Sequence, residues 1–124
     1  MGKILIVEDD RDLVESYTDL LEAHHHQVTS VGKASEVVPI LSRLWPDLII
    51  LDLNLPGASG VVVISLVRNY QRMAKTKIII VTGYPELLES RNYISSRVDF
   101  IMRKPFQNET LIAKIDELLS LSVS

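Results

Sequence analysis

The chain has 124 residues, of which 47% are hydrophobic and 23% charged, and this composition favours one globular domain over residues 1–124 rather than a disordered segment. The absence of cysteine excludes disulfides and thiolate metal sites. A net charge of −3 lacks the basic excess that phosphate-backbone binding requires, so we expect no direct contact with nucleic acid.

Targeting signals are also missing from the sequence. Met1-Gly2-Lys3 leads into an apolar stretch that is too brief for a signal peptide, and no later apolar run is long enough to span a bilayer. We therefore expect a cytoplasmic protein that makes no membrane contact.

Continuous apolar runs alternate with amphipathic segments along the chain. The apolar runs predict strands near residues 3–8, 27–30, 47–52, 77–82 and 100–103. The segments between them predict helices from Asp10 or Asp12 to about His24, near 34–44, 60–73 and 85–95, and from about Asn108. Such alternation is typical of an α/β fold in which helices cover a parallel sheet.

Three local features add detail to this scheme. Pro39 inside the second helix predicts a kink or a late helix start. The residues His24, His25 and His26 cannot share one helical face, so we interpret all three as solvated rather than as metal ligands. The third helix has surplus apolar residues, which indicate either deeper burial or a contact face for a partner or a second copy; they are Val62, Leu66 and Met73.

Polar side chains stand where four of the predicted strands end. Glu8 and Asp9 follow the first strand, Asp52 ends the third, Thr82 ends the fourth and Lys104 follows the fifth. Parallel strands end at the same edge of a sheet, and ligands of open α/β sheets bind beyond that edge. We therefore expect these five side chains to lie together.

Three carboxylates crowded into a cleft require a compensating cation. An all-oxygen site without His or Cys suits Mg²⁺, which usually keeps waters and phosphate oxygens as further ligands. Such an ion would allow Asp52 to attack phosphorus and form an aspartyl phosphate. Lys104 would supply a positive charge and Thr82 a hydroxyl for the phosphoryl group. A single Asp at a strand end is more often a turn or cap residue, but the combined set indicates function.

The sequence resembles the receiver domains of two-component response regulators, the CheY-like family, over essentially its whole length. The matching segments are Ile4-Leu5-Ile6-Val7-Glu8-Asp9-Asp10, Leu51-Asp52-Leu53-Asn54-Leu55-Pro56-Gly57, Val81-Thr82-Gly83 and Lys104-Pro105-Phe106. This resemblance implies a flavodoxin-like, doubly wound, three-layer α/β/α fold with five parallel strands in the order 2-1-3-4-5.

The resemblance also implies roles for single residues. Asp52 would accept a phosphoryl group from a histidine kinase, a histidine phosphotransfer protein or a small phosphodonor. Asp9 and Asp52 would bind Mg²⁺ with the backbone carbonyl of Asn54, while Glu8 assists through water. Thr82 and Lys104 would each contact a phosphoryl oxygen.

Two further positions concern the lifetime and the effect of the phosphoryl group. Asn54 and Tyr84 match positions that tune hydrolysis, and the bulk of Tyr84 predicts a relatively long-lived phosphorylated state. In the family an aromatic residue that switches together with the Thr stands three residues before the Lys, and here Ile101 occupies that place. Strand alternation sends the adjacent Phe100 to the opposite face of the sheet.

We expect a signalling module whose own chemistry is limited to self-phosphorylation and slow dephosphorylation. The alternatives are a Mg²⁺-dependent hydrolase with an aspartyl intermediate and a receiver-like adaptor that works without phosphorylation. The effector or target is not identified by the sequence. A phosphorylation-dependent homodimer would use the fourth helix, fifth strand and fifth helix, which are the usual surface in the family, with the third helix as a competing site.

Overall fold

A single all-parallel sheet organises the molecule, which we describe from a computed structural model over residues 2–52, 60–83, 94 and 96–121. Its strands lie in the order β2-β1-β3-β4-β5, as expected. They are β1 (Lys3–Val7), β2 (Gln27–Val31), β3 (Leu48–Asp52), β4 (Lys77–Thr82) and β5 (Phe100–Arg103). The expected doubly wound, flavodoxin-like α/β/α fold is therefore confirmed.

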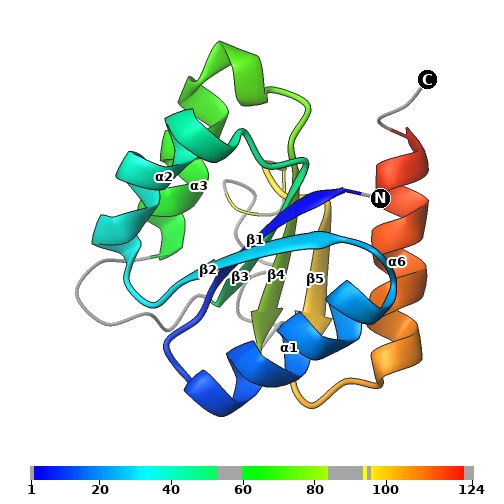
Figure 1. Cartoon of the computed structure of the whole chain (residues 1–124). Helices are drawn as coiled ribbons and strands as arrows, with labels where there is room; N and C mark the ends of the chain where they lie inside the picture. The colour runs from blue at the N-terminus through cyan, green and yellow to red at the C-terminus, as the bar shows by residue number, and fades with distance from the viewer. Residues whose placement is uncertain (1, 53–59, 84–93, 95, 122–124) are drawn as a thin grey trace.

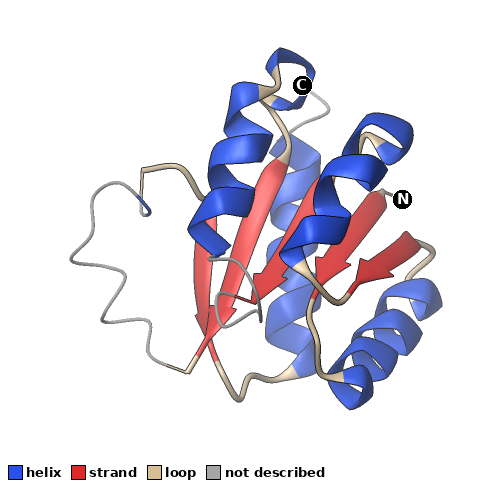
Figure 2. Ribbon diagram, turned by 90° about the vertical axis from the view of Figure 1, so that its left-hand side faces the viewer, coloured by secondary structure: helices blue, strands red, loops and turns tan. Residues whose placement is uncertain are grey.

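Helices cover both faces of this sheet (Figures 1 and 2). The helical elements are α1 (Arg11–Ala23), η1 (Ala34–Glu36), α2 (Val37–Leu44), α3 (Gly60–Asn69), η2 (Gln71–Met73) and α6 (Asn108–Leu121). Figure 1 shows α1 and α6 on one face, with α2 and α3 on the other. The helix expected over 85–95 lies outside the described residues. Among the helices described, none is long and apolar enough to cross a membrane.

Helix starts follow local chemistry. The side chain of Asp10 accepts hydrogen bonds from the backbone N–H groups of Asp12 and Leu13 at 3.0 and 3.3 Å, which satisfies two donors that α1 itself leaves unpaired. The late start predicted for the second helix is also found. A 3₁₀ turn precedes α2, so Pro39 falls within the first turn of the α-helix, where its missing N–H costs little.

The third helix is shorter than expected. The prediction extended it to Met73, but α3 ends at Asn69 and Tyr70 has an extended backbone (φ −83°, ψ 114°) before the turn of η2 begins. Asn has a low helix propensity because its side chain can compete for backbone hydrogen bonds, and a helix end at Asn69 agrees with this preference. The surplus apolar residues of this segment differ in burial. Met73 is only 1% exposed, whereas Val62 is 47% exposed.

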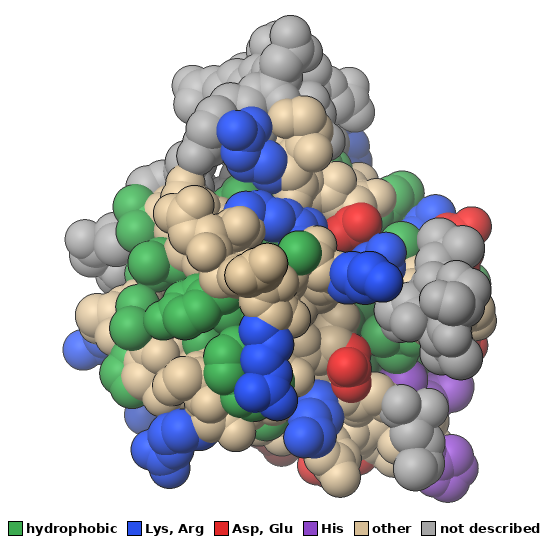
Figure 3. Space-filling model, turned by 90° about the horizontal axis from the view of Figure 1, so that it is seen from above, with side chains coloured by type: hydrophobic (Ala, Val, Ile, Leu, Met, Phe, Trp, Pro, Cys, Tyr) green, Lys and Arg blue, Asp and Glu red, His purple; other side chains and the backbone are tan. Residues whose placement is uncertain are grey.

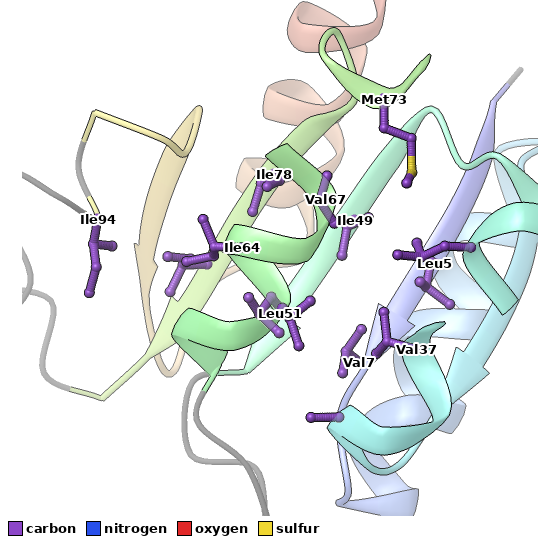
Figure 4. Close-up of a cluster of buried hydrophobic side chains, with 14 residues drawn as sticks. Leu5, Val7, Val37, Ile49, Leu51, Ile64, Val67, Met73, Ile78 and Ile94 are labelled. Carbon is purple, nitrogen blue, oxygen red and sulfur yellow. The ribbon is translucent and has the colours of Figure 1, made fainter. Parts of the chain in front are cut away.

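Alternate residues of the strands build two separate cores. In β1, Leu5 and Val7 point toward α2 and α3, whereas Ile4 and Ile6 point toward α1 and α6. Figure 4 shows the first of these clusters, in which strand residues such as Ile49 and Leu51 lie against Ile64 and Val67 of α3. Because the interior strands are buried on both faces, they read as continuous apolar runs rather than as alternating ones.

His26 corrects the expectation that all three histidines are solvated. His24 and His25 are exposed, but His26 is only 7% exposed, and its Nδ1 accepts a hydrogen bond from the backbone N–H of Gly2 at 3.1 Å. The chain reverses here through a left-handed residue, His25 at φ 69°, which turns the next side chain into the protein. Spacing on a helix could not reveal this, because His26 lies beyond the end of α1.

We predict that His26 makes folding sensitive to mild acid. Burial lowers the pKa of His26 in the folded chain, so between the folded pKa and the ordinary value of about 6.5 the unfolded chain binds more protons. The contribution of neutral His26 to stability is therefore complete above about pH 6.5 and falls as the pH drops below that value. Urea unfolding at pH 7.5 and 5.5 should show a smaller pH effect in His26→Gln than in the wild type. The exposed control His24→Gln should keep the wild-type effect, and an equal pH effect in all three proteins would contradict the prediction.

Candidate functional site

The strand ends carry the predicted site residues to one edge of the sheet. Val7 pairs with Leu51 and Asp52 pairs with Val81, so Glu8, Asp52 and Thr82 stand at nearly the same level on three neighbouring strands. In Figure 1 the arrowheads of β4 and β5 mark this edge at the bottom of the view. The backbone N–H of Lys104 donates to the carbonyl of Thr82 at 2.8 Å, which places the lysine at the same edge.

Three carboxylates meet there. Glu8, Asp9 and Asp52 each offer an oxygen, and these oxygens lie within 4.8 Å of one another. Glu8 is 4% and Asp52 5% exposed, whereas Asp9 is exposed. The cluster therefore has two acids facing the interior and one open to solvent, an arrangement in which the negative charges repel one another strongly.

The positive charge of Lys104 offsets part of this repulsion. Its ammonium nitrogen lies 3.2 Å from Oε1 of Glu8 and 3.4 Å from Oδ2 of Asp52. The lysine side chain remains 29% exposed, so the cation bridges the two buried acids from the rim of the site. Among the described residues, this ammonium thus contacts two of the three carboxylates, Glu8 and Asp52.

The proton affinities of these groups reflect their crowding. Burial and, after it, a hydrogen bond with the Asp52 side chain together raise the pKa of Glu8 to about 7. The Glu8 carboxyl therefore holds a proton more readily than an ordinary glutamate does. Partial burial works to lower the pKa of Lys104, but the charges of Asp52 and Glu8 outweigh it, so that pKa lies above its ordinary value. The lysine remains a cation.

The donor set fits a hard metal ion. All three acids supply oxygen, and neither His nor Cys takes part in the cluster. Three carboxylates meet here and Lys104 contacts two of them, so the cluster can carry more negative charge than this lysine balances. A bound dication would relieve that imbalance, so the arrangement is compatible with a metal site.

The proposed switch residues lie on β4 and β5. Thr82 is 5% exposed at the end of β4, directly opposite Arg103 of β5. Ile101 packs against the cluster beneath α2 and α3, and Phe100 packs against the opposite cluster. The prediction that alternation sends Phe100 to the other face is therefore confirmed. Two predicted site residues, Asn54 and Tyr84, lie outside the described residues.

An aromatic pair near Lys104 was not anticipated from the sequence. Tyr17 of α1 stacks on Phe106 with ring centroids 5.7 Å apart and ring planes at 7°. Helical spacing placed Tyr17 on the sheet-facing side of α1, but only the fold brings it to the turn after Lys104. Burial raises the pKa of Tyr17, and the charges of Glu8 and Asp52 add to the effect, so its hydroxyl keeps its proton.

The opposite end of the sheet has a different character. Figure 3 looks down on that end, where the strands begin, and shows Lys and Arg side chains spread across the surface with Asp and Glu side chains among them. The acid cluster lies at the other end. A molecule with a small net charge therefore concentrates negative charge where a cation could bind.

Removing the lysine charge should destabilise the metal-free protein. Lys104→Met leaves two buried carboxylates without their bridging cation, so we expect a loss of about 1–3 kcal/mol in unfolding free energy. Urea unfolding in EDTA measures this loss. Lys114→Met is the matched control, because Lys114 pairs with exposed Glu117 and should cost less than about 1 kcal/mol. Equal losses in the two variants would show that Lys104 does not balance the cluster.

Known proteins share this chain's sequence and fold. The model of the family described as "Response regulator receiver domain" matches residues 4–116. The transcriptional regulatory protein BaeR of Escherichia coli is 31% identical over 117 residues, which cover 94% of this chain and 48% of BaeR. The phosphate regulon transcriptional regulatory protein PhoB of Klebsiella pneumoniae is 29% identical, over 94% of this chain and 51% of PhoB.

Solved structures give the same result. A two-component response regulator from Clostridium difficile superposes with a TM-score of 0.89 at 25% identity, and the match covers 100% of both chains. A CheY-like receiver domain protein from Methanospirillum hungatei gives a TM-score of 0.87 at 28% identity, over 97% of this chain and 94% of that one. The chain spans about half the length of the curated relatives it matches. The chain belongs to the family of response regulator receiver domains.

Proposed function

We propose that this receiver domain accepts a phosphoryl group on Asp52 from the phosphohistidine of a histidine kinase or a histidine phosphotransfer protein, and that the added charge alters partner binding. The observation that carries the proposal is the bridging position of Lys104, whose ammonium lies 3.4 Å from Asp52 and 3.2 Å from Glu8. A cation held beside a single nucleophilic carboxylate is suited to receive a phosphoryl group.

The acids would hold Mg²⁺. Asp9 and Asp52 would ligate it together with the backbone carbonyl of Asn54, and Glu8 would assist through water. When bound, the ion would neutralise the carboxylates and draw phosphoryl oxygens toward Asp52. The exposure of Asp9 supports this assignment, because Mg²⁺ retains several waters and needs an open side.

The chain's own residues would guide the transfer. A carboxylate oxygen of Asp52 attacks phosphorus, a new P–O bond forms and the P–N bond of the donor breaks. The donor's imidazole leaves with the electron pair of that bond and takes up a proton. Lys104 then pairs with a phosphoryl oxygen, and the Thr82 hydroxyl donates to another.

The domain would act as a signal carrier rather than as a turnover enzyme. Tyr84 would shield phosphorus from water and slow the loss of the phosphoryl group, with Asn54 as a second tuning position. Movement of Thr82 toward the phosphoryl group would favour a different arrangement of its surroundings, including the face beside Ile101. Such a switch would work without an aromatic residue at position 101, where this chain has isoleucine.

Partners follow from these roles. A histidine kinase would supply the phosphoryl group in the cytoplasm, and an effector domain or a separate target would read it. Two relatives are named transcriptional regulatory proteins, so control of transcription is the output that their names support. A phosphorylation-dependent homodimer would use the surface of the fourth helix, β5 and α6. On the competing α3 surface, Val62 is the largely exposed apolar side chain among those described.

Acetyl phosphate labelling tests the proposal. With Mg²⁺ present, intact-mass spectrometry should show a gain of one phosphoryl group per chain, and EDTA should prevent it. Asp52→Asn should remove the label because it removes the nucleophile. Asp10→Asn, a neighbouring acid whose capping role Asn can keep, should be labelled like the wild type.

The other outcomes distinguish the alternatives. Continuous release of phosphate over many turnovers without stable label would indicate a hydrolase. The absence of label in the wild type would indicate an adaptor that works without phosphorylation. Either result would contradict the proposed function.

A further inference from the structure

The turn that carries Lys104 is held at its two ends by backbone hydrogen bonds. Lys104 N–H donates to the Thr82 carbonyl at 2.8 Å, and at the other end the N–H of Leu111 donates to the Gln107 carbonyl at 3.3 Å. Between them lie Pro105 and Phe106. The position of Phe106 therefore influences where the turn places the side chain of Lys104.

Phe106 is held by Tyr17. The two rings stack nearly parallel, with centroids 5.7 Å apart and an interplanar angle of 7°. Tyr17 is 4% exposed and belongs to the core beneath α1 and α6, so it is a fixed surface for the more exposed Phe106. The stack links the rigid core to the turn.

Open space lies beside this contact. A hollow of about 500 Å³ borders the turn, and its lining includes Leu13, Tyr17, Lys104, Pro105 and Phe106. A turn that borders open space can shift unless a side chain anchors it. Within the described residues, the stack on Tyr17 is the aromatic contact that Phe106 makes.

The placement of the ammonium depends on the backbone of the turn. A lysine side chain has four rotatable bonds, so its charge reaches a defined position only if its backbone is fixed. Here the ammonium must meet both Glu8 and Asp52, at 3.2 and 3.4 Å. A shift of the turn would weaken both contacts together.

We propose that Tyr17 is a positioning residue for phosphoryl transfer, whose ring fixes the Lys104–Phe106 turn through Phe106 and so holds the Lys104 ammonium beside Asp52. This inference rests on the function proposed above. Tyr17, which belongs to α1, would thus influence the phosphorylation site through its contact with Phe106.

Removing the hydroxyl of Tyr17 would distinguish the role of the aromatic ring from that of the polar group. Tyr17 Oη is buried and has no hydrogen-bond partner among the described residues. A phenylalanine would therefore keep the stack and lose no hydrogen bond seen in this structure. The ring, rather than the hydroxyl, should carry the positioning effect.

The test measures the rate of labelling by acetyl phosphate at saturating donor, as a function of Mg²⁺ concentration. Tyr17→Leu should lower the maximal rate roughly tenfold or more, because small misplacements of a charged group are costly in transfer reactions. The Mg²⁺ concentration at half-maximal rate should stay near the wild-type value, since Glu8, Asp9 and Asp52 are unchanged. Tyr17→Phe should restore most of the lost rate.

Two further variants address the contact itself. Phe106→Leu should slow labelling as Tyr17→Leu does, and the double variant should be no slower than either, because both break one stack. Phe106→Leu also carries the test if Tyr17→Leu fails to fold. Phe100→Leu is the matched control, because Phe100 packs against the same core but lies on β5 before the turn. It should be labelled at the wild-type rate.

The outcomes separate the two proposals. A wild-type chain that takes no label overturns the proposed function. A labelled wild type whose Tyr17→Leu and Phe106→Leu variants are labelled no more slowly than Phe100→Leu overturns the positioning role and leaves the function intact. Additive losses in the double variant, or a failure of Tyr17→Phe to restore the rate, would also overturn it.

Discussion

Repulsion among Glu8, Asp9 and Asp52 is the constraint around which the functional edge of this protein is built. Their oxygens lie within 4.8 Å of one another, and two of the three side chains are almost fully buried. The ammonium of Lys104 offsets part of this repulsion because it contacts both buried acids, and burial raises the pKa of Glu8, which favours its neutral form. The balance is incomplete, so the cluster is compatible with a bound cation.

The sheet makes this crowding unavoidable. Because all five strands run in parallel, the groups at their ends are delivered to one edge, and the register sets Asp52 opposite Val81, the residue before Thr82. The strands behind these ends are buried on both faces by α1 and α6 on one side and by α2 and α3 on the other. Packing of this density resists displacement, so the two buried acids, Glu8 and Asp52, have little room to move apart.

Much of this arrangement could be predicted from the sequence, because it depends on local pattern. Apolar runs such as Ile78 to Val81 mark buried strands, and the polar residue after each run marks its end. The strand order came from resemblance to a family, since pairing between distant strands leaves no local signal. The convergence of Glu8, Asp9, Asp52 and Lys104 followed from the parallel sheet alone.

What the sequence did not reveal depends on contacts across the fold. His26 is buried because the turn after α1 reverses the chain, and Tyr17 meets Phe106 only when α1 and the turn after β5 lie side by side. Each of these features joins segments whose relation emerges only in three dimensions.

Thermal unfolding in EDTA and in excess Mg²⁺ tests the central claim, that the acid cluster is under-neutralised and binds a dication, most directly. Mg²⁺ should raise the unfolding temperature of the wild-type chain, because an ion that binds only the folded state stabilises it. Asp9→Asn should lose most of this rise, and Asp10→Asn should keep it. The account would be contradicted by a wild-type unfolding temperature that does not respond to Mg²⁺, or by an equal rise in Asp9→Asn.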